Sequence, residues 1–181
     1  MQDKNHRIAP EFGGALEVKA LEADGRFAGY ASIFDVIDSQ RDRVKHGAFR
    51  RSLASREIPV KLLWQHQWEQ PIGVIEAIFE DDRGLYVQGR LLMDVAKARE
   101  AHALLKAGAL RGMSIGYQVK QSRRDADTGV RELLEVELWE VSIVTLPANA
   151  QANVTVVKSR MADEWQELMV VLQAATDALR I

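Results

Sequence analysis

The most constraining feature of this chain is a series of short segments in which apolar and polar residues alternate. Alternation with a period of two places the apolar side chains on one face of a β-strand. Turn residues such as Asp24-Gly25 separate several of these segments, which favours hairpins between neighbouring strands. The pattern predicts strands over residues 15–20, 26–34, 60–65, 71–79, 85–91, 113–120, 130–145 and 152–157.

Helical spacing of apolar residues occurs in fewer places. A helix is predicted over residues 95–107, with Asp94 as its N-cap and Gly108 directly after its C-terminus. A short helix is predicted over 47–55, and an amphipathic helix near the end of the chain. Strands in hairpin order with few helices favour a mainly β fold with flanking helices, a mixed barrel or sandwich of the α+β class.

The chain has 181 residues, a length typical of a single domain. Its apolar residues, 47% of the total, are enough to build one sizeable core. We expect a flexible tail over residues 1–12, a β-barrel domain over 13–160 and the amphipathic helix over 161–181. The apolar runs are too short to span a bilayer, and the N-terminal residues lack the apolar segment of a signal peptide. The sequence therefore predicts a cytosolic protein with no membrane partner.

Charge and cysteine content exclude several kinds of function. The net charge of -2 and the absence of a basic stripe give no reason to expect nucleic-acid binding. The chain has no cysteine, which excludes a disulfide framework, a thiolate nucleophile and a zinc site with Cys ligands.

Three polar residues stand in or beside apolar, strand-like segments, in the order His66, Ser114 and Glu140. A base, a nucleophile and an orienting carboxylate are the groups that acyl transfer by a hydroxyl requires. Ser114 lies in a Gly-x-Ser-x-Gly pattern, but this pattern follows a predicted helix and opens a strand. All 4 histidines also precede Ser114. The α/β-hydrolase arrangement has the reverse order on both counts and is excluded.

The serine has a structural alternative, because Ser114 could be a turn residue that bonds to its own backbone. Gly112 and Gly116 flank it without side chains, so we expect a substrate backbone to approach closely there.

The other two residues also have alternatives. His66 could be a structural histidine at a strand end, although Trp64 and Trp68 on either side would favour the neutral imidazole that accepts a proton. Alternation places Glu140 on the core-facing side of its strand, where a carboxylate needs a partner, either an imidazole or an Arg. His102, on the apolar stripe of the predicted helix, remains an alternative third member of the site.

A polar loop contains Asp35, Asp38 and Asp42. Their spacing does not match an EF-hand, so an Asx-turn is a better interpretation than a cation site.

Five segments resemble, in order, the prohead (capsid maturation) proteases of tailed bacteriophages of the HK97 type. They cover most of the chain, from about residue 20 to 155. The segments are Gly29-Tyr30-Ala31-Ser32-Ile33-Phe34; His46-Gly47-Ala48-Phe49; Leu63-Trp64-Gln65-His66 with Pro71-Ile72-Gly73; the Gly108 to Gly116 run; and Glu140-Val141-Ser142-Ile143-Val144 with Pro147-Ala148-Asn149.

This family is similar to the herpesvirus assemblins, whose fold is an antiparallel β-barrel surrounded by helices and whose triad is Ser-His-His. The resemblance implies that Ser114 is the nucleophile and His66 the base. It also implies that Glu140 takes the place of the second histidine, with His102 in reserve. It assigns no oxyanion donor.

The resemblance further implies a serine endopeptidase that cuts the scaffold, or a scaffolding segment of the major capsid protein, and itself. It would act inside the assembling procapsid in the host cytoplasm, without metal or other cofactor. By analogy with the assemblins, the expected active form is a homodimer. The alternative is a non-catalytic capsid-assembly or scaffold-binding module on the same barrel.

Overall fold

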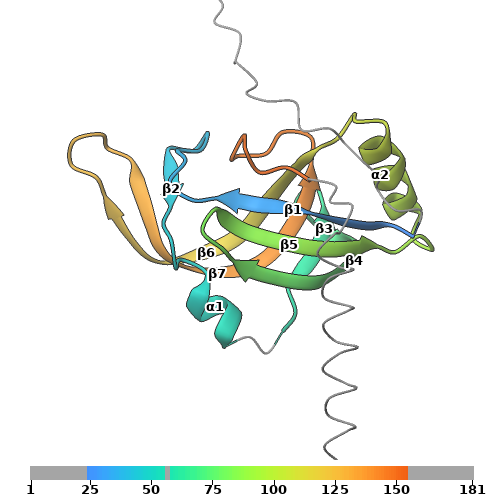
Figure 1. Ribbon diagram of the computed structural model, residues 1–181, viewed down its shortest axis with the longest axis horizontal. Coiled ribbons are helices and arrows are strands. Elements are labelled where there is room, and N and C mark those ends of the chain that lie inside the picture. The colour runs from blue at the N-terminus through green and yellow to red at the C-terminus, as the bar shows by residue number, and fades with distance from the viewer. Residues whose placement is uncertain (1–23, 56–57, 155–181) are drawn as a thin grey trace, which may run out of the picture.

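The computed structural model describes residues 24–55 and 58–154, which form a mainly β structure (Figure 1). The predicted tail, the predicted strand over 15–20 and the predicted C-terminal helix lie outside these residues. The elements are β1 (Arg26–Ile33), β2 (Asp42–Val44), α1 (Arg50–Ala54), β3 (Lys61–Trp64), β4 (Gln67–Glu80), β5 (Gly84–Leu91), α2 (Ala96–Lys106), β6 (Gly112–Arg124) and β7 (Arg131–Val144).

All seven described strands belong to one sheet, whose order is β1-β5-β4-β3-β7-β2 with β6 paired to β7. The sheet curls into a half-barrel (Figure 1). The predicted mainly β fold is correct, but the sheet is mixed and not purely antiparallel: β1–β5, β3–β4, β4–β5 and β6–β7 pair antiparallel, whereas β2 and β3 both pair with β7 in parallel. Parallel neighbours need a long connection, and β4, β5, α2 and β6 supply it between β3 and β7. The path of named strands is open, although single bridges from Asn153 and Val154 reach β6 and β1.

The strand β2 and the start of β4 differ from the sequence prediction. The polar loop predicted around Asp35, Asp38 and Asp42 contains the strand β2, in which Asp42, only 2% exposed, is neutralised by Arg131 of β7. The strand after the β3–β4 turn begins at Gln67 instead of residue 71, because the hairpin needs only two turn residues. Local alternation cannot show either feature, since both depend on a partner strand.

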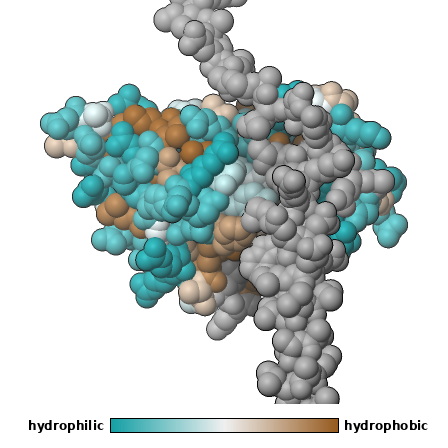
Figure 2. All heavy atoms as spheres, in the orientation of Figure 1, coloured by the Kyte–Doolittle hydropathy of each residue, from teal (hydrophilic) through white to brown (hydrophobic). Residues whose placement is uncertain are grey.

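Helix α2 covers the core with Ala98, Ala101 and Leu105, which are all buried. Asp94 is not its N-cap: the cap position is Val95, without a side-chain hydrogen bond. Gly108 has φ +70° where the chain leaves the helix, the left-handed conformation expected of a residue in that place. The face in Figure 2 is mostly hydrophilic with small separate apolar patches, in keeping with apolar side chains that face inward. None of the described helices is long and apolar enough to cross a bilayer.

The middle of β7 is held by hydrogen bonds to α1 and to Ala48, which lies just before α1 in the chain. β2 pairs with β7 at residues 131–133 and β3 at residues 140–143, which leaves the strand edge between them uncovered. There the Val136 N–H donates to the Ala48 carbonyl and the Leu138 N–H donates to Ser52 Oγ, both at 2.9 Å. These bonds complete the edge of the strand that carries Glu140.

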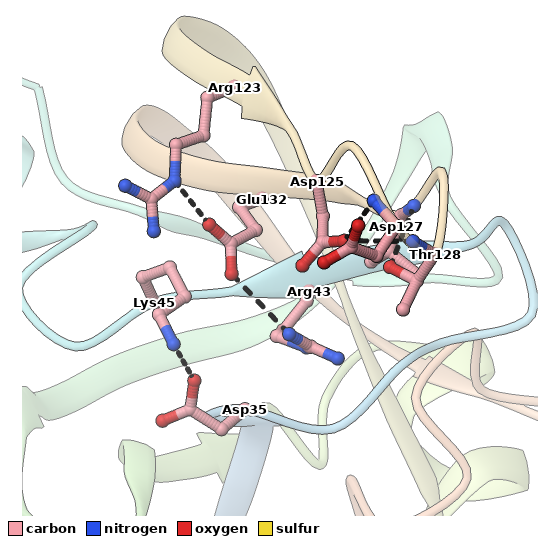
Figure 3. Close-up of polar contacts among 9 residues, drawn as sticks. Asp35, Arg43, Lys45, Arg123, Asp125, Asp127, Thr128 and Glu132 are labelled. Atoms are coloured by element: carbon pink, nitrogen blue, oxygen red, sulfur yellow. Dashed lines mark hydrogen bonds and ion pairs between the residues drawn. The ribbon is translucent and has the colours of Figure 1, made fainter.

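A polar cluster fixes the far end of the β6–β7 hairpin to β2 (Figure 3). Arg123 Nε donates to Glu132 Oε2 at 2.5 Å, and Arg43 Nη1 lies 3.4 Å from Glu132 Oε1. The hydrogen bond from Arg123 holds the pKa of Glu132 below its usual value, against the effect of desolvation. The cluster stabilises the hairpin but lies at the end of β7 opposite to Glu140.

Candidate active site

His66 lies in the tight turn between β3 and β4. Trp64 pairs with Gln67, so the turn contains only Gln65 and His66, with φ values of 50° and 60°. Positive φ at both positions is the type I′ pattern, which normally selects Asn or Gly. A non-glycine pair in this conformation persists only where surrounding contacts hold it.

Four hydrogen bonds hold this turn against the end of β7. The backbone N–H of Gln65 donates to the Ile143 carbonyl at 3.0 Å. The Gln65 amide donates to Thr145 Oγ1 at 2.8 Å and accepts the Thr145 N–H at 3.2 Å. The backbone N–H of His66 donates to Ser142 Oγ at 3.0 Å. The position of the imidazole is therefore set by β7.

The imidazole reaches a buried carboxylate. His66 Nδ1 lies 2.6 Å from Glu140 Oε1, and the Glu140 side chain is only 2% exposed. The predicted core-facing position of Glu140 is therefore correct, and its partner is the imidazole and not an Arg. We assign the Nδ1 proton as the donor to the carboxylate, which leaves Nε2 as a proton acceptor. A neutral imidazole in this state can act as a general base.

Register places Ser114 on the same face of the sheet as this pair. In the β6–β7 ladder Ser114 lies opposite Ser142, and Gly116 lies opposite Glu140. Ser114 and His66 line the same cavity, whose volume is about 470 Å³. Among the described residues the Ser114 hydroxyl has no hydrogen-bond partner, and His66 is not bonded to it either, so the hydroxyl is uncommitted. Such catalytic hydrogen bonds often form only when substrate is bound.

Gly112 and Gly116 leave space that neighbouring groups of the fold occupy, and the approach of a substrate backbone to them stays a prediction. A Cβ at residue 116 would overlap the Glu140 carboxylate and lie 2.8 Å from Glu140 Cγ. A Cβ at residue 112 would lie 2.7 Å from Pro147 Cδ. Gly116 therefore makes room for the carboxylate, and Gly112 for the turn after β7.

The expected aromatic enclosure of His66 is not present. Trp68 is 60% exposed and makes an edge contact with Trp139, with ring centroids 6.0 Å apart. The His66 side chain is 45% exposed. His102 lies on α2, and it is not among the described residues that line the cavity. The structure thus brings Glu140 to His66, and leaves His102 on another element.

The other wall of the cavity is polar and includes Asp38, Asp42 and Tyr117. Asp38 Oδ1 accepts the N–H groups of Gln40 and Asp42, both at 2.8 Å, which is the predicted Asx-turn. Burial raises the pKa of Tyr117 to about 12, and the negative charge of Asp42 adds to this effect, so its phenol stays protonated at neutral pH. In residues 24–55 and 58–154 we find no cluster of His, Cys, Asp or Glu that could hold a metal ion.

The sequence of the chain is similar to those of known proteins. Residues 14–167 match the sequence model of the caudovirus prohead serine proteases. The chain belongs to this family. It is 36% identical over 137 residues to the prohead protease of Enterobacteria phage HK97, covering 75% of this chain and 61% of that protein. It is 32% identical over 150 residues to the capsid polyprotein of Pseudomonas phage PAJU2, covering 80% of this chain and 22% of that protein.

Two solved structures are also similar to the structure of this chain. The bacteriophage T4 capsid assembly protease aligns with a TM-score of 0.50 and 13% identity, covering 66% of this chain and 82% of that one. This likeness concerns the fold and agrees with the mainly β architecture. The KSHV protease in complex with a hexapeptide phosphonate inhibitor aligns with a TM-score of 0.49 and 13% identity, over 80% and 76% of the two chains.

Two residues near the site of this family member were missed by sequence reasoning. Ser142 and Gln65 both contact the elements that carry His66 and Glu140. The period of two offered a signal for Ser142, because it stands two residues after Glu140 and so shares its face. Nothing in the sequence signalled Gln65, whose contact with Thr145 depends on the parallel pairing of β3 with β7.

Proposed function

We propose that this chain is a serine endopeptidase that cleaves capsid-assembly proteins during prohead maturation, with Ser114, His66 and Glu140 as its catalytic residues. One observation carries the proposal: a histidine bonded to a buried carboxylate shares a cavity with an uncommitted serine hydroxyl, in a member of the prohead serine protease family. Each residue type also fits its role in acyl transfer.

In the proposed mechanism, Ser114 Oγ attacks the carbonyl carbon of the scissile peptide while His66 Nε2 takes the hydroxyl proton. The imidazolium formed in this step keeps its Nδ1–H bonded to Glu140, whose negative charge stabilises it. His66 then donates the proton from Nε2 to the leaving amine, which breaks the C–N bond and leaves an acyl-enzyme. Water attacks the ester by the same route, with His66 as base and then acid, and Ser114 regains its proton.

We propose that the substrates are the scaffold, or a scaffolding segment of the major capsid protein, and the protease itself. The names of the HK97 and PAJU2 relatives, a prohead protease and a capsid polyprotein, support capsid proteins as the substrate class. The proposed location is the interior of the assembling procapsid in the host cytoplasm. Enclosure there would raise the local substrate concentration without tight binding. The proposed active form is a homodimer, and the proposed mechanism uses no metal or cofactor.

Co-expression with the cognate major capsid protein tests the function. The wild-type chain should shorten the capsid protein, and intact-mass analysis should give the cut position. Ser114→Ala should leave the capsid protein at full length. Ser122→Ala, on the exposed outer part of the same strand, is the matched control and should cleave normally. Cleavage by Ser114→Ala would refute the assignment of the nucleophile.

A non-catalytic capsid-assembly module is the second candidate, because Ser114 is not hydrogen-bonded to His66 in this structure. A fluorophosphonate probe separates the two functions. An active enzyme should be labelled at Ser114 and should lose the label in His66→Ala, whereas a dormant barrel should stay unlabelled. The measurement is repeated at high protein concentration, since a homodimer that forms only when concentrated would escape a dilute assay.

A further inference from the structure

Ser142 stands at the centre of a closed ring of hydrogen bonds. Its Oγ donates to Glu140 Oε2 at 2.6 Å and accepts the backbone N–H of His66 at 3.0 Å. Glu140 Oε1 in turn lies 2.6 Å from His66 Nδ1. Three bonds therefore join three residues, and each residue takes part in two of them.

The chemistry of the partners fixes the direction of each bond. An ionised carboxylate can only accept and a backbone N–H can only donate, so the Ser142 hydroxyl must point its proton at Glu140 and its lone pair at His66. Ser142 is 0% exposed, and its single proton is committed to the carboxylate. It is therefore not a competing nucleophile, although it lies directly opposite Ser114 in the ladder.

General-base catalysis by His66 requires a fixed rotation of the Glu140 carboxylate and a fixed position of the turn that carries the imidazole. The ring of hydrogen bonds links these two requirements. The bond to Oε2 sets the rotation of the carboxylate, so that Oε1 faces Nδ1. The bond from the His66 N–H sets the height of the type I′ turn above β7, and hence the place of the imidazole. Small errors in either variable weaken a base because proton transfer requires close alignment.

We propose that Ser142 is a positioning residue for the reaction, one that holds the Glu140 carboxylate and the His66 turn in register through a single hydroxyl. The inference rests on the proposed function, since it concerns the same site.

The test compares Ser142→Ala with Ser52→Ala. Ser52 is a matched control, because its hydroxyl also accepts a backbone N–H from the β7 side of the fold, that of Leu138, but lies away from the carboxylate. Turnover is measured with a quenched fluorescent peptide that spans the junction cut in the co-expression experiment. Ser142→Ala should lower kcat by about 10- to 100-fold with KM changed by less than about twofold, as for other residues that orient a catalytic group. Ser52→Ala should keep kcat within about twofold.

A spectroscopic arm does not depend on turnover. The Nδ1 proton of His66 is identified by NMR as a downfield resonance that disappears in His66→Gln. It should move upfield or broaden in Ser142→Ala and stay in place in Ser52→Ala. Ser142→Cys, which keeps the size of the side chain but bonds more weakly, should be intermediate in both kcat and resonance position.

The outcomes separate this inference from the function on which it rests. A wild-type chain that fails to cut the peptide contradicts the proposed function. A wild-type chain that cuts, with Ser142→Ala equal to it in kcat or with an unchanged Nδ1 resonance, overturns the positioning role alone. Equal losses in Ser142→Ala and Ser52→Ala also overturn it, because they would show a general effect on the stability of β7.

Discussion

Glu140 is a carboxylate with a 2% exposed side chain, and two hydrogen bonds, from His66 and Ser142, offset the cost of its burial. The same bonds divide its two oxygens between the imidazole and the hydroxyl. The Glu140 carboxylate thus has a structural role and a proposed catalytic role, which makes Glu140 the most informative residue to change.

Glu140→Gln should lower kcat by roughly 10³- to 10⁴-fold, because an amide cannot stabilise the imidazolium and can favour the wrong tautomer. Steady-state kinetics with the quenched peptide measures this loss. Glu137→Gln is the control: Glu137 is exposed on the same strand and forms an ion pair with Lys120, so its replacement should leave kcat unchanged. Normal turnover by Glu140→Gln would remove this carboxylate from the mechanism.

Gly116→Ala should destabilise the fold by about 1–3 kcal/mol, since the added methyl group must displace the Glu140 carboxylate. Urea denaturation gives the free energy of unfolding. A double-mutant cycle is the control: in a Glu140→Ala background the obstructing atoms are gone, and the cost of Gly116→Ala should shrink. An equal cost in both backgrounds would mean that the methyl group meets another obstacle.

At the scale of the element, the turn between β3 and β4 shows what a sequence can and cannot predict. Alternation predicts the strands on both sides, and the apolar setting of Glu140 correctly predicts its burial. Neither feature shows that β3 pairs with β7 in parallel, because that pairing joins residues far apart in the chain. The sequence therefore left two possible partners for Glu140, an imidazole or an Arg. It also could not predict the contacts that hold the turn between β3 and β4.

Gln65→Ala should loosen this turn, because the Gln65 amide makes two hydrogen bonds with Thr145. We expect a loss of about 1 kcal/mol in the free energy of unfolding and a lower kcat at unchanged KM. Urea denaturation and peptide kinetics measure the two effects. Gln67→Ala, two residues later and exposed, should change neither quantity. If Gln65→Ala keeps wild-type kcat, the clamp does not position His66.

At the scale of the whole molecule, the dependence of stability on pH includes opposite contributions from two carboxyl groups. Burial raises the pKa of Asp38, although the N–H groups of Asp42 and Gln40 partly offset this. Burial alone would also raise the pKa of Asp81, but hydrogen bonds from Tyr30 and the backbone hold it below its usual value. The sign of each contribution follows from linkage between proton binding and folding.

Asp38→Asn should stabilise the protein at pH 7 by less than about 1 kcal/mol, since solvent screens a part-exposed carboxylate. The folded state binds the Asp38 proton more tightly than the unfolded chain does, so ionisation costs stability once the pH rises above about 4. The gain should therefore disappear as the pH falls below that value. Urea denaturation between pH 3 and pH 7 measures it.

Asp81→Asn supplies the control of opposite sign. The lowered pKa of Asp81 contributes stability above the unfolded-state value of about 3.9, and this contribution is lost as the pH falls through the folded-state pKa. Asp81→Asn should therefore be less stable than the wild type at pH 7, and the difference should narrow in acid. Parallel curves for the two variants would contradict both assignments.

The 74 positions that separate His66 from Glu140 have a consequence for the order of events in the cell. During translation His66 is synthesised long before β7, the strand that carries Glu140. No nascent chain shorter than β7 can assemble the pair, so under the proposed mechanism translation itself delays the first cut. If capsid subunits are the substrates, as proposed, those made nearby at the same time should stay intact until β7 has been synthesised.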